Sequence, residues 1–186
     1  MFSLKVIAVV SMVIDHFGRF FFPHSLALHI AGRLAFPLFA WLIANGAHHT
    51  RDIDKYLTRL FMFALISQVP YYFGYYLSGH FEWFHNVLFT LFLGLLAIRF
   101  VRATPRRALQ AAAVLSCALL AWALHADYGA AGVLSIVVFY IFFEKFWYLA
   151  LGEALVLGIL PLISYLLATS YHLSLWRFYY SSSFEI

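Results

Sequence analysis

The chain has 186 residues, of which 65% are hydrophobic and 11% charged, with a net charge of +4 and a mean hydropathy of +0.87. A soluble domain carries roughly 25% charged residues, so this chain has too few to cover a surface exposed to water. Its basic residues fall in short gaps between apolar runs, so we expect no nucleic-acid partner. We predict a single all-α integral membrane domain over residues 1–186, a polytopic helix bundle surrounded by membrane lipid.

The apolar runs predict the membrane spans. A helix needs about 20 mostly apolar residues to cross the hydrocarbon of a bilayer. On that criterion we predict about seven transmembrane helices, in chain order at 4–22, 26–47, 56–76, 85–101, 107–124, 130–147 and 149–168. The first run contains charged residues and no small-x-small cleavage site, so we expect it to be retained. The single cysteine, Cys117, excludes an intramolecular disulfide.

The positions of Lys and Arg predict the orientation. With a cytoplasmic N-terminus the inner side receives most of them: Lys5, Arg51, Lys55, Arg59, Arg99, Arg102, Arg106, Arg107 and Lys145. Arg19, Arg33 and Arg177 are left toward the outer side. Because cytoplasmic loops carry the excess of Lys and Arg, the N-terminus is expected in the cytoplasm.

The first predicted helix contains an ionisable cluster, Asp15, His16 and Arg19. A charge inside a membrane costs at least ~2.5–3.5 kcal/mol, so such groups face the protein interior or a watery cavity and pair with one another. Asp15 can reach Arg19 one turn on, and Asp15 and Arg33 both lie roughly 10 Å below the outer surface. We therefore expect an Asp15–Arg33 contact, with His16 turned toward a cavity as a proton acceptor.

Further polar residues are expected at similar or shallower depth. They are His29, Gln68, Asn86, Thr90, Asp127 and Tyr128, and together with Arg19 they predict one buried substrate-binding site in the outer half. We expect no metal there. An alternative is that Asp15 and Arg33 only hold two helices together and that His16 hydrogen-bonds a neighbouring carbonyl.

The cytoplasmic side carries two basic stretches. One runs from His49 and Arg51 to Lys55 and Arg59, and the other extends over 99–107. Positive-inside topology explains such residues, and the alternative is a site for a phosphate-rich cytosolic donor, since Arg binds phosphate with two parallel hydrogen bonds.

Several stretches of the chain resemble the TraX family, which includes the F-pilin acetylase of conjugative plasmids. The matching pieces, in order, are LKVIA at 4–8, IDHFG at 14–18, GRLAFPLFA at 32–40, NG at 45–46, HTR at 49–51, YLTRL at 56–60, ISQVPY at 66–71, NVLFTL at 86–91, Gly94, DYG at 127–129 and GV at 132–133. Their combination and order make the resemblance specific.

The resemblance implies a multi-pass enzyme of the bacterial inner membrane that takes acetyl groups from cytosolic acetyl-CoA. The acceptor would be an amine or hydroxyl on a peptide, glycan or lipid at the outer face; for F-pilin it is the N-terminal amine. Asp15, His16 and Arg33 match the family's most distinctive polar positions. We predict His16 as general base or covalent nucleophile, Arg33, oriented by Asp15, as oxyanion stabiliser, and His49, Arg51, Lys55 and Arg59 as donor-binding residues.

Two other functions fit the same residues. A proton-coupled transporter would use the buried ionisable groups without covalent chemistry, although no internal repeat of the kind common in transporters is visible. A non-catalytic membrane assembly protein is the other alternative. It is kept open by the serine-rich end at 181–186, which replaces a further segment of the family.

Overall fold

The computed structural model describes residues 2–22, 25–77 and 85–159, and every element it assigns there is helical. The elements in order are α1 (Phe2–Phe21), α2 (Leu26–Arg33), α3 (Ala35–His49), α4 (Ile53–Leu77), α5 (Val87–Ala103), α6 (Arg107–Ala123), α7 (Gly129–Ile141), α8 (Phe146–Glu153) and the π-helix η1 (Ala154–Ile159). The all-α prediction is confirmed for this part of the chain. Within these residues no helix combines the length and the apolar character that crossing a membrane requires.

The predicted helix 26–47 is wrong as one element, because the structure breaks it at Leu34. Pro37 explains the break. A proline has no N–H to donate to the carbonyl four residues earlier, here Arg33, and its ring collides with that carbonyl. In α3 Pro37 occupies the first turn, where backbone N–H groups have no partner within the helix. Pro70, by contrast, lies inside the 25-residue α4, which continues through it.

The predicted ends of the later helices also need correction. The run 130–147 ends as a helix at Ile141, and the chain turns before α8 begins at Phe146. The last predicted helix, 149–168, is represented by the end of α8 and by η1, and residues 160–168 lie outside the described part.

Local signals explain several helix ends. Asp52 precedes α4, and its carboxylate accepts the backbone N–H of Lys55 at 2.9 Å, as an N-cap does. Asn86 caps α5 by accepting the N–H of Leu88 at 2.9 Å. Thr104 lies between α5 and Pro105, and a residue before proline is disfavoured in helical conformation, so α5 ends there.

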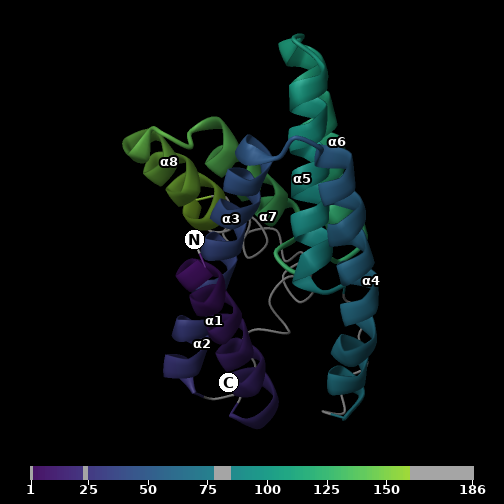
Figure 1. The fold of residues 1–186 in the computed structure, drawn as a ribbon. Coiled ribbons are helices and arrows are strands. Elements are labelled where there is room, and N and C mark those ends of the chain that lie inside the picture. The colour runs from purple at the N-terminus through teal and green to yellow at the C-terminus, as the bar shows by residue number, and fades with distance from the viewer. Residues whose placement is uncertain (1, 23–24, 78–84, 160–186) are drawn as a thin grey trace, which may run out of the picture.

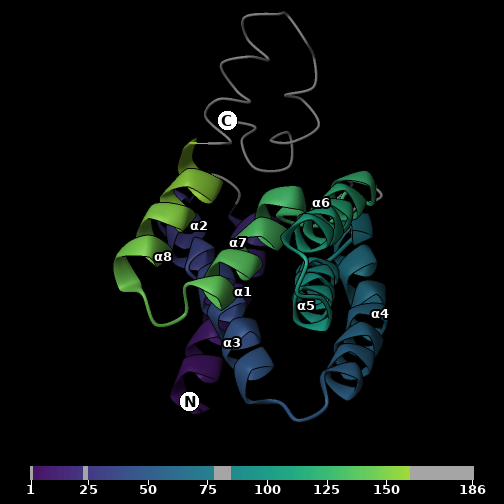
Figure 2. The same cartoon turned by 90° about the horizontal axis from the view of Figure 1, so that it is seen from above.

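The helices form two groups with α7 between them. In Figure 1 α1, α2, α3 and α8 lie to one side of α7, while α4, α5 and α6 lie to the other, and Figure 2 shows α8 and α4 at opposite edges of the helices. The hydrophobic core is continuous across α3, α5 and α7, where Phe36, Leu91 and Ile136 are almost fully buried. Thus α7 joins the two groups, and the start of α7 lies where they meet.

Candidate functional site

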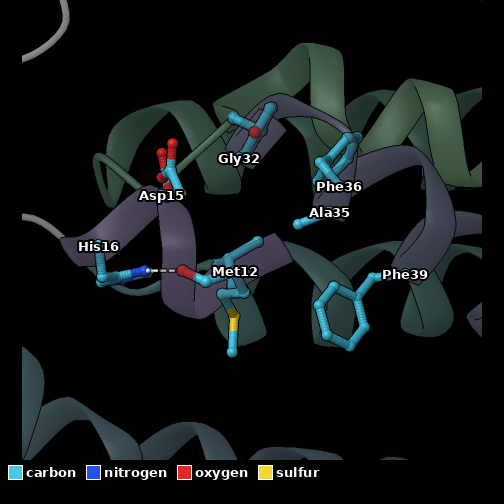
Figure 3. A pocket seen from close by; sticks show the side chains of 10 residues that line it. Met12, Asp15, His16, Gly32, Ala35, Phe36 and Phe39 are labelled. Carbon is cyan, nitrogen blue, oxygen red and sulfur yellow. Dashed lines mark hydrogen bonds between the residues drawn. The ribbon is translucent and has the colours of Figure 1, made fainter. Parts of the chain in front are cut away.

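A small cavity lies where α1, the junction of α2 with α3, and the starts of α5 and α7 converge. Its walls include Asp15 and His16 of α1 and Asp127 and Tyr128 before α7, completed by Met12, Gly32, Ala35, Phe36, Phe39 and Val87 (Figure 3). Its volume is about 20 Å³, which is room for about one water molecule. Four of the residues predicted for the site therefore line one cavity.

Gly32 lets α1 and α2 approach closely at Asp15. A Cβ atom added at Gly32 would lie 2.3 Å from the Asp15 Cβ and 2.7 Å from its Cα. Such distances are far inside van der Waals contact, so any other residue would force the helices apart. Asp15 is buried, with 6% of its surface exposed, and its side chain extends toward Gly32 (Figure 3).

His16 is held in a defined orientation by its own helix. Its Nδ1 hydrogen-bonds the carbonyl oxygen of Met12, one turn earlier, at 2.9 Å. A carbonyl can only accept, so Nδ1 carries the proton and the lone pair of the neutral imidazole is on Nε2. The ring also meets the Tyr71 ring edge-on, with centroids 6.2 Å apart. The hydrogen bond to a neighbouring carbonyl, the structural alternative to a catalytic role, is present, and it selects the tautomer that a general base needs.

Tyr128 enters the cavity from a strained turn. His125, Tyr128 and Gly129 all have positive φ angles, of 49°, 64° and 46°. For residues other than glycine this conformation is sparsely populated and persists only where neighbouring contacts enforce it.

Two kinds of contact enforce the turn. The Tyr128 ring stacks on Phe36, with centroids 3.9 Å apart and planes 14° apart. The Thr90 hydroxyl donates to the carbonyl of Asp127, and the backbone N–H of Asp127 donates to the carbonyl of His85 at 2.9 Å. Thr90, predicted as a substrate ligand, therefore supports the turn instead of lining the cavity.

Arg33 does not form the predicted ion pair with Asp15 among the described residues. Its guanidinium lies over the Tyr128 ring, 5.9 Å from the centroid, and the side chain is exposed. The reason is helical rotation: Asp15 packs against Gly32, and the next residue points about 100° away. Arg33 thus contacts the Tyr128 ring and does not line the cavity. The side chains of Arg19 and His29, also predicted for the site, lie outside the described part of the chain.

Gln68 and Asn86 form a buried polar network beside the cavity. The Asn86 side-chain amide donates to Gln68 Oε1 at 2.8 Å and to the Ala64 carbonyl at 3.0 Å, and the Asn86 backbone N–H donates to Gln68 Oε1 at 3.0 Å. This network ties α4 to the start of α5, next to Val87 of the cavity wall. Its amides contact each other rather than the cavity.

The predicted donor-binding residues lie at the opposite end of α3 and α4. His49 Nδ1 donates to the Asn45 carbonyl at 2.8 Å, and Lys55 pairs with Asp52 at 3.3 Å. Arg51 and Arg59 are exposed. The backbone N–H of Lys55 and then its charge hold the pKa of Asp52 below its usual range.

Sequence reasoning missed Gly32, Phe36 and Tyr71. Gly32 carried a signal, since an isolated glycine in a helical run often marks close packing. Phe36 and Tyr71 read as ordinary apolar or interfacial residues, and nothing in the sequence placed them beside Tyr128 and His16.

Comparison with known proteins identifies the family of this chain. The family model described as "TraX protein" matches residues 2–176. "Probable fimbrial assembly protein FimC, serogroup H1" of Dichelobacter nodosus is 37% identical over 140 residues, covering 69% of this chain and 56% of that protein. "Protein TraX" of Escherichia coli is 34% identical over 140 residues, covering 74% and 54%. The chain thus spans about half the length of these curated relatives. No solved structure matches.

Proposed function

The chain belongs to the TraX family, and from that premise we propose that it is a membrane acetyltransferase. It would move an acetyl group from cytosolic acetyl-CoA to an amine or hydroxyl at the outer face of the bacterial inner membrane. The name of the Dichelobacter relative favours a fimbrial protein as the acceptor or partner. The observation that carries the proposal is the cavity that joins Asp15 and His16 to Asp127 and Tyr128.

His16 is the proposed general base. As the acceptor nitrogen or oxygen attacks the thioester carbonyl carbon, its proton passes to His16 Nε2. The tetrahedral intermediate collapses, the carbon–sulfur bond breaks, and the departing thiolate takes the proton from the imidazolium. No redox change occurs. A base of this kind typically contributes ~10²–10⁴-fold in rate.

Asp15 and Arg33 have separate proposed roles. The buried carboxylate of Asp15 lines the same cavity and stabilises the imidazolium that forms when His16 takes the proton. Arg33 would stabilise the oxyanion after its guanidinium leaves the Tyr128 ring. The cavity itself has room for little more than the nucleophilic group of the acceptor.

Two observations support the proposed membrane location: the apolar side chains exposed on the surface of the molecule and the apolar composition of the chain. Large apolar side chains are exposed along α1, α4, α6 and α8, for example Val13, Ile66, Leu119 and Trp147. Monomeric soluble proteins rarely expose apolar patches of this extent. Lipid around these faces would account for the exposed apolar side chains and for the apolar composition. The N-terminus would lie in the cytoplasm, as the positions of Lys and Arg predict. In intact cells, a membrane-impermeant maleimide should label Ser25→Cys and not Arg107→Cys, both in a Cys117→Ser background.

The transfer reaction is tested with purified protein, labelled acetyl-CoA and pilin-like peptide, glycan or lipid acceptors. We expect His16→Asn to reduce transfer by at least ~10²-fold, because its amide can still donate to the Met12 carbonyl but cannot take a proton. His48→Ala, on the far end of α3, is the matched control and should retain transfer. Equal activity of His16→Asn and wild type would remove the proposed base.

A non-catalytic assembly role is the second candidate, favoured by the name of the Dichelobacter relative. It predicts association with a pilus or fimbrial subunit without acetylation. Loss of pili with an unchanged subunit mass after His16→Asn would support this role against acyl transfer.

A further inference from the structure

A groove between α4 and α5 has the form of a binding site that the proposed reaction leaves unassigned. The two helices lie side by side in both views (Figures 1 and 2). The groove is open along its length and has a volume of about 410 Å³. Leu57 and Phe61 of α4 and Phe92 and Leu96 of α5 make its apolar lining, with the rings of Phe61 and Phe92 5.0 Å apart.

One end of the groove is polar and carries an arginine. Arg99 Nε donates to Asp54 Oδ1 at 2.5 Å, and Nη2 to Oδ2 at 3.5 Å. Both side chains are accessible, at 37% and 66% exposure, so water weakens the pair and an incoming dianion can compete for the guanidinium. Lys55 and Arg59, both exposed, lie on neighbouring turns of α4. The groove therefore offers an apolar slot whose polar end holds the Arg99–Asp54 ion pair, with Arg59 and the Asp52-paired Lys55 nearby.

We propose that this groove binds the acyl-CoA donor, with its phosphates at Arg99 and its pantetheine arm along Phe61, Phe92 and Leu96. The inference rests on the proposed acetyl transfer and assigns that reaction its donor site. On binding, the Arg99 guanidinium would leave Asp54 and hydrogen-bond a phosphate, for which its planar set of N–H donors is suited. The charge at one end and the apolar lining match a ligand with a phosphorylated head and a long, weakly polar arm.

The geometry also relates the groove to the cavity. From Phe61 to Tyr71 the rise along α4 is about 15 Å, and the Tyr71 ring meets His16. A thioester at the end of an extended arm can span such a distance, whereas a compact donor cannot. Gln68 and Asn86 lie between the two regions, on α4 and at the start of α5.

Binding is measured directly, without transfer, by equilibrium binding of labelled CoA to the full chain in lipid nanodiscs. We expect Arg99→Ala to weaken binding about tenfold or more, as loss of a charge-assisted contact does. Leu96→Trp should weaken it by filling the groove. Lys145→Ala, an exposed cation elsewhere, and Leu109→Trp, an exposed leucine of α6, are the matched controls and should bind like wild type.

Two further measurements keep the inference independent of folding. Arg99→Lys should retain part of the affinity, and a photoreactive CoA analogue should label α4 and α5 of the unmodified chain. Wild-type CoA binding with labelling elsewhere, or with unchanged affinity in Arg99→Ala and Leu96→Trp, overturns the donor site while leaving acetyl transfer standing. A phospholipid that fills the groove and is not displaced by CoA also overturns it. CoA binding in the groove without any acetyl transfer would instead contradict the proposed function.

Discussion

The contact between Gly32 and Asp15 makes a sharp prediction about the site. In Gly32→Ala the new Cβ would lie 2.3 Å from the Asp15 Cβ and 2.7 Å from the Asp15 Cα, where ordinary contact begins at 3.4 Å. No side-chain rotation moves a Cα or a Cβ, so α1 and α2 must separate by at least about 1 Å. Overpacking of this kind costs typically ~1–3 kcal/mol of folding free energy.

The same displacement carries Asp15 and His16 away from Asp127 and Tyr128. A misplacement of about 1 Å in a catalytic constellation can cost ~10²-fold in rate. We therefore expect Gly32→Ala to lower acetyl transfer by about that factor and to lower the unfolding free energy of the protein in detergent. Thermal or denaturant unfolding, measured beside transfer with labelled acetyl-CoA, gives both quantities.

Gly18→Ala is the matched control on the same helix pair. Its Cβ would meet the Leu28 Cβ at 3.0 Å, a contact that a shift of a few tenths of an ångström relieves. Alanine is also favoured over glycine in a helix by about 1 kcal/mol, so this variant should be close to wild type. If Gly32→Ala unfolds and transfers like Gly18→Ala, the close approach of α1 and α2 does not position the site.

Three further predictions concern other parts of the structure. Asn86→Ala removes a helix cap and the partner of Gln68, and should lower the unfolding free energy by ~2–4 kcal/mol in denaturant titration, more than Asn86→Asp, which keeps the cap. Tyr128→Ala should lower the unfolding free energy in the same titration, because the ring stacked on Phe36 is gone, and Tyr128→Phe, which keeps the ring, should lower it less. The pKa of Asp52 is lowered by the Lys55 backbone N–H, so its stabilising effect is present above pH 3.8 and is lost as the pH falls below that value. When the free energy of unfolding is measured against pH, Asp52→Asn should lack this loss of stability at acid pH.

The sequence predicted some local features because they depend on nearby residues. Apolar runs of helical length located α1, α4, α5 and α6 to within a few residues. Pro37 could have predicted the break after Arg33, since a proline disrupts the bond to the carbonyl four residues earlier. The contrast with Pro70, which α4 contains, shows that proline position alone does not settle a boundary, because the packing around the helix decides whether it continues.

The sequence by itself determined that Asp15 and residue 33 lie at nearly the same level on neighbouring helices. It left the rotation of the helices open. Neighbouring positions on a helix differ by about 100°, so a small rotation exchanges Gly32 for Arg33 opposite Asp15. Tertiary packing decided this: the closest approach is available only to the residue without a side chain. The stack of Tyr128 on Phe36 and the groove between α4 and α5 likewise depend on contacts between segments far apart in the chain.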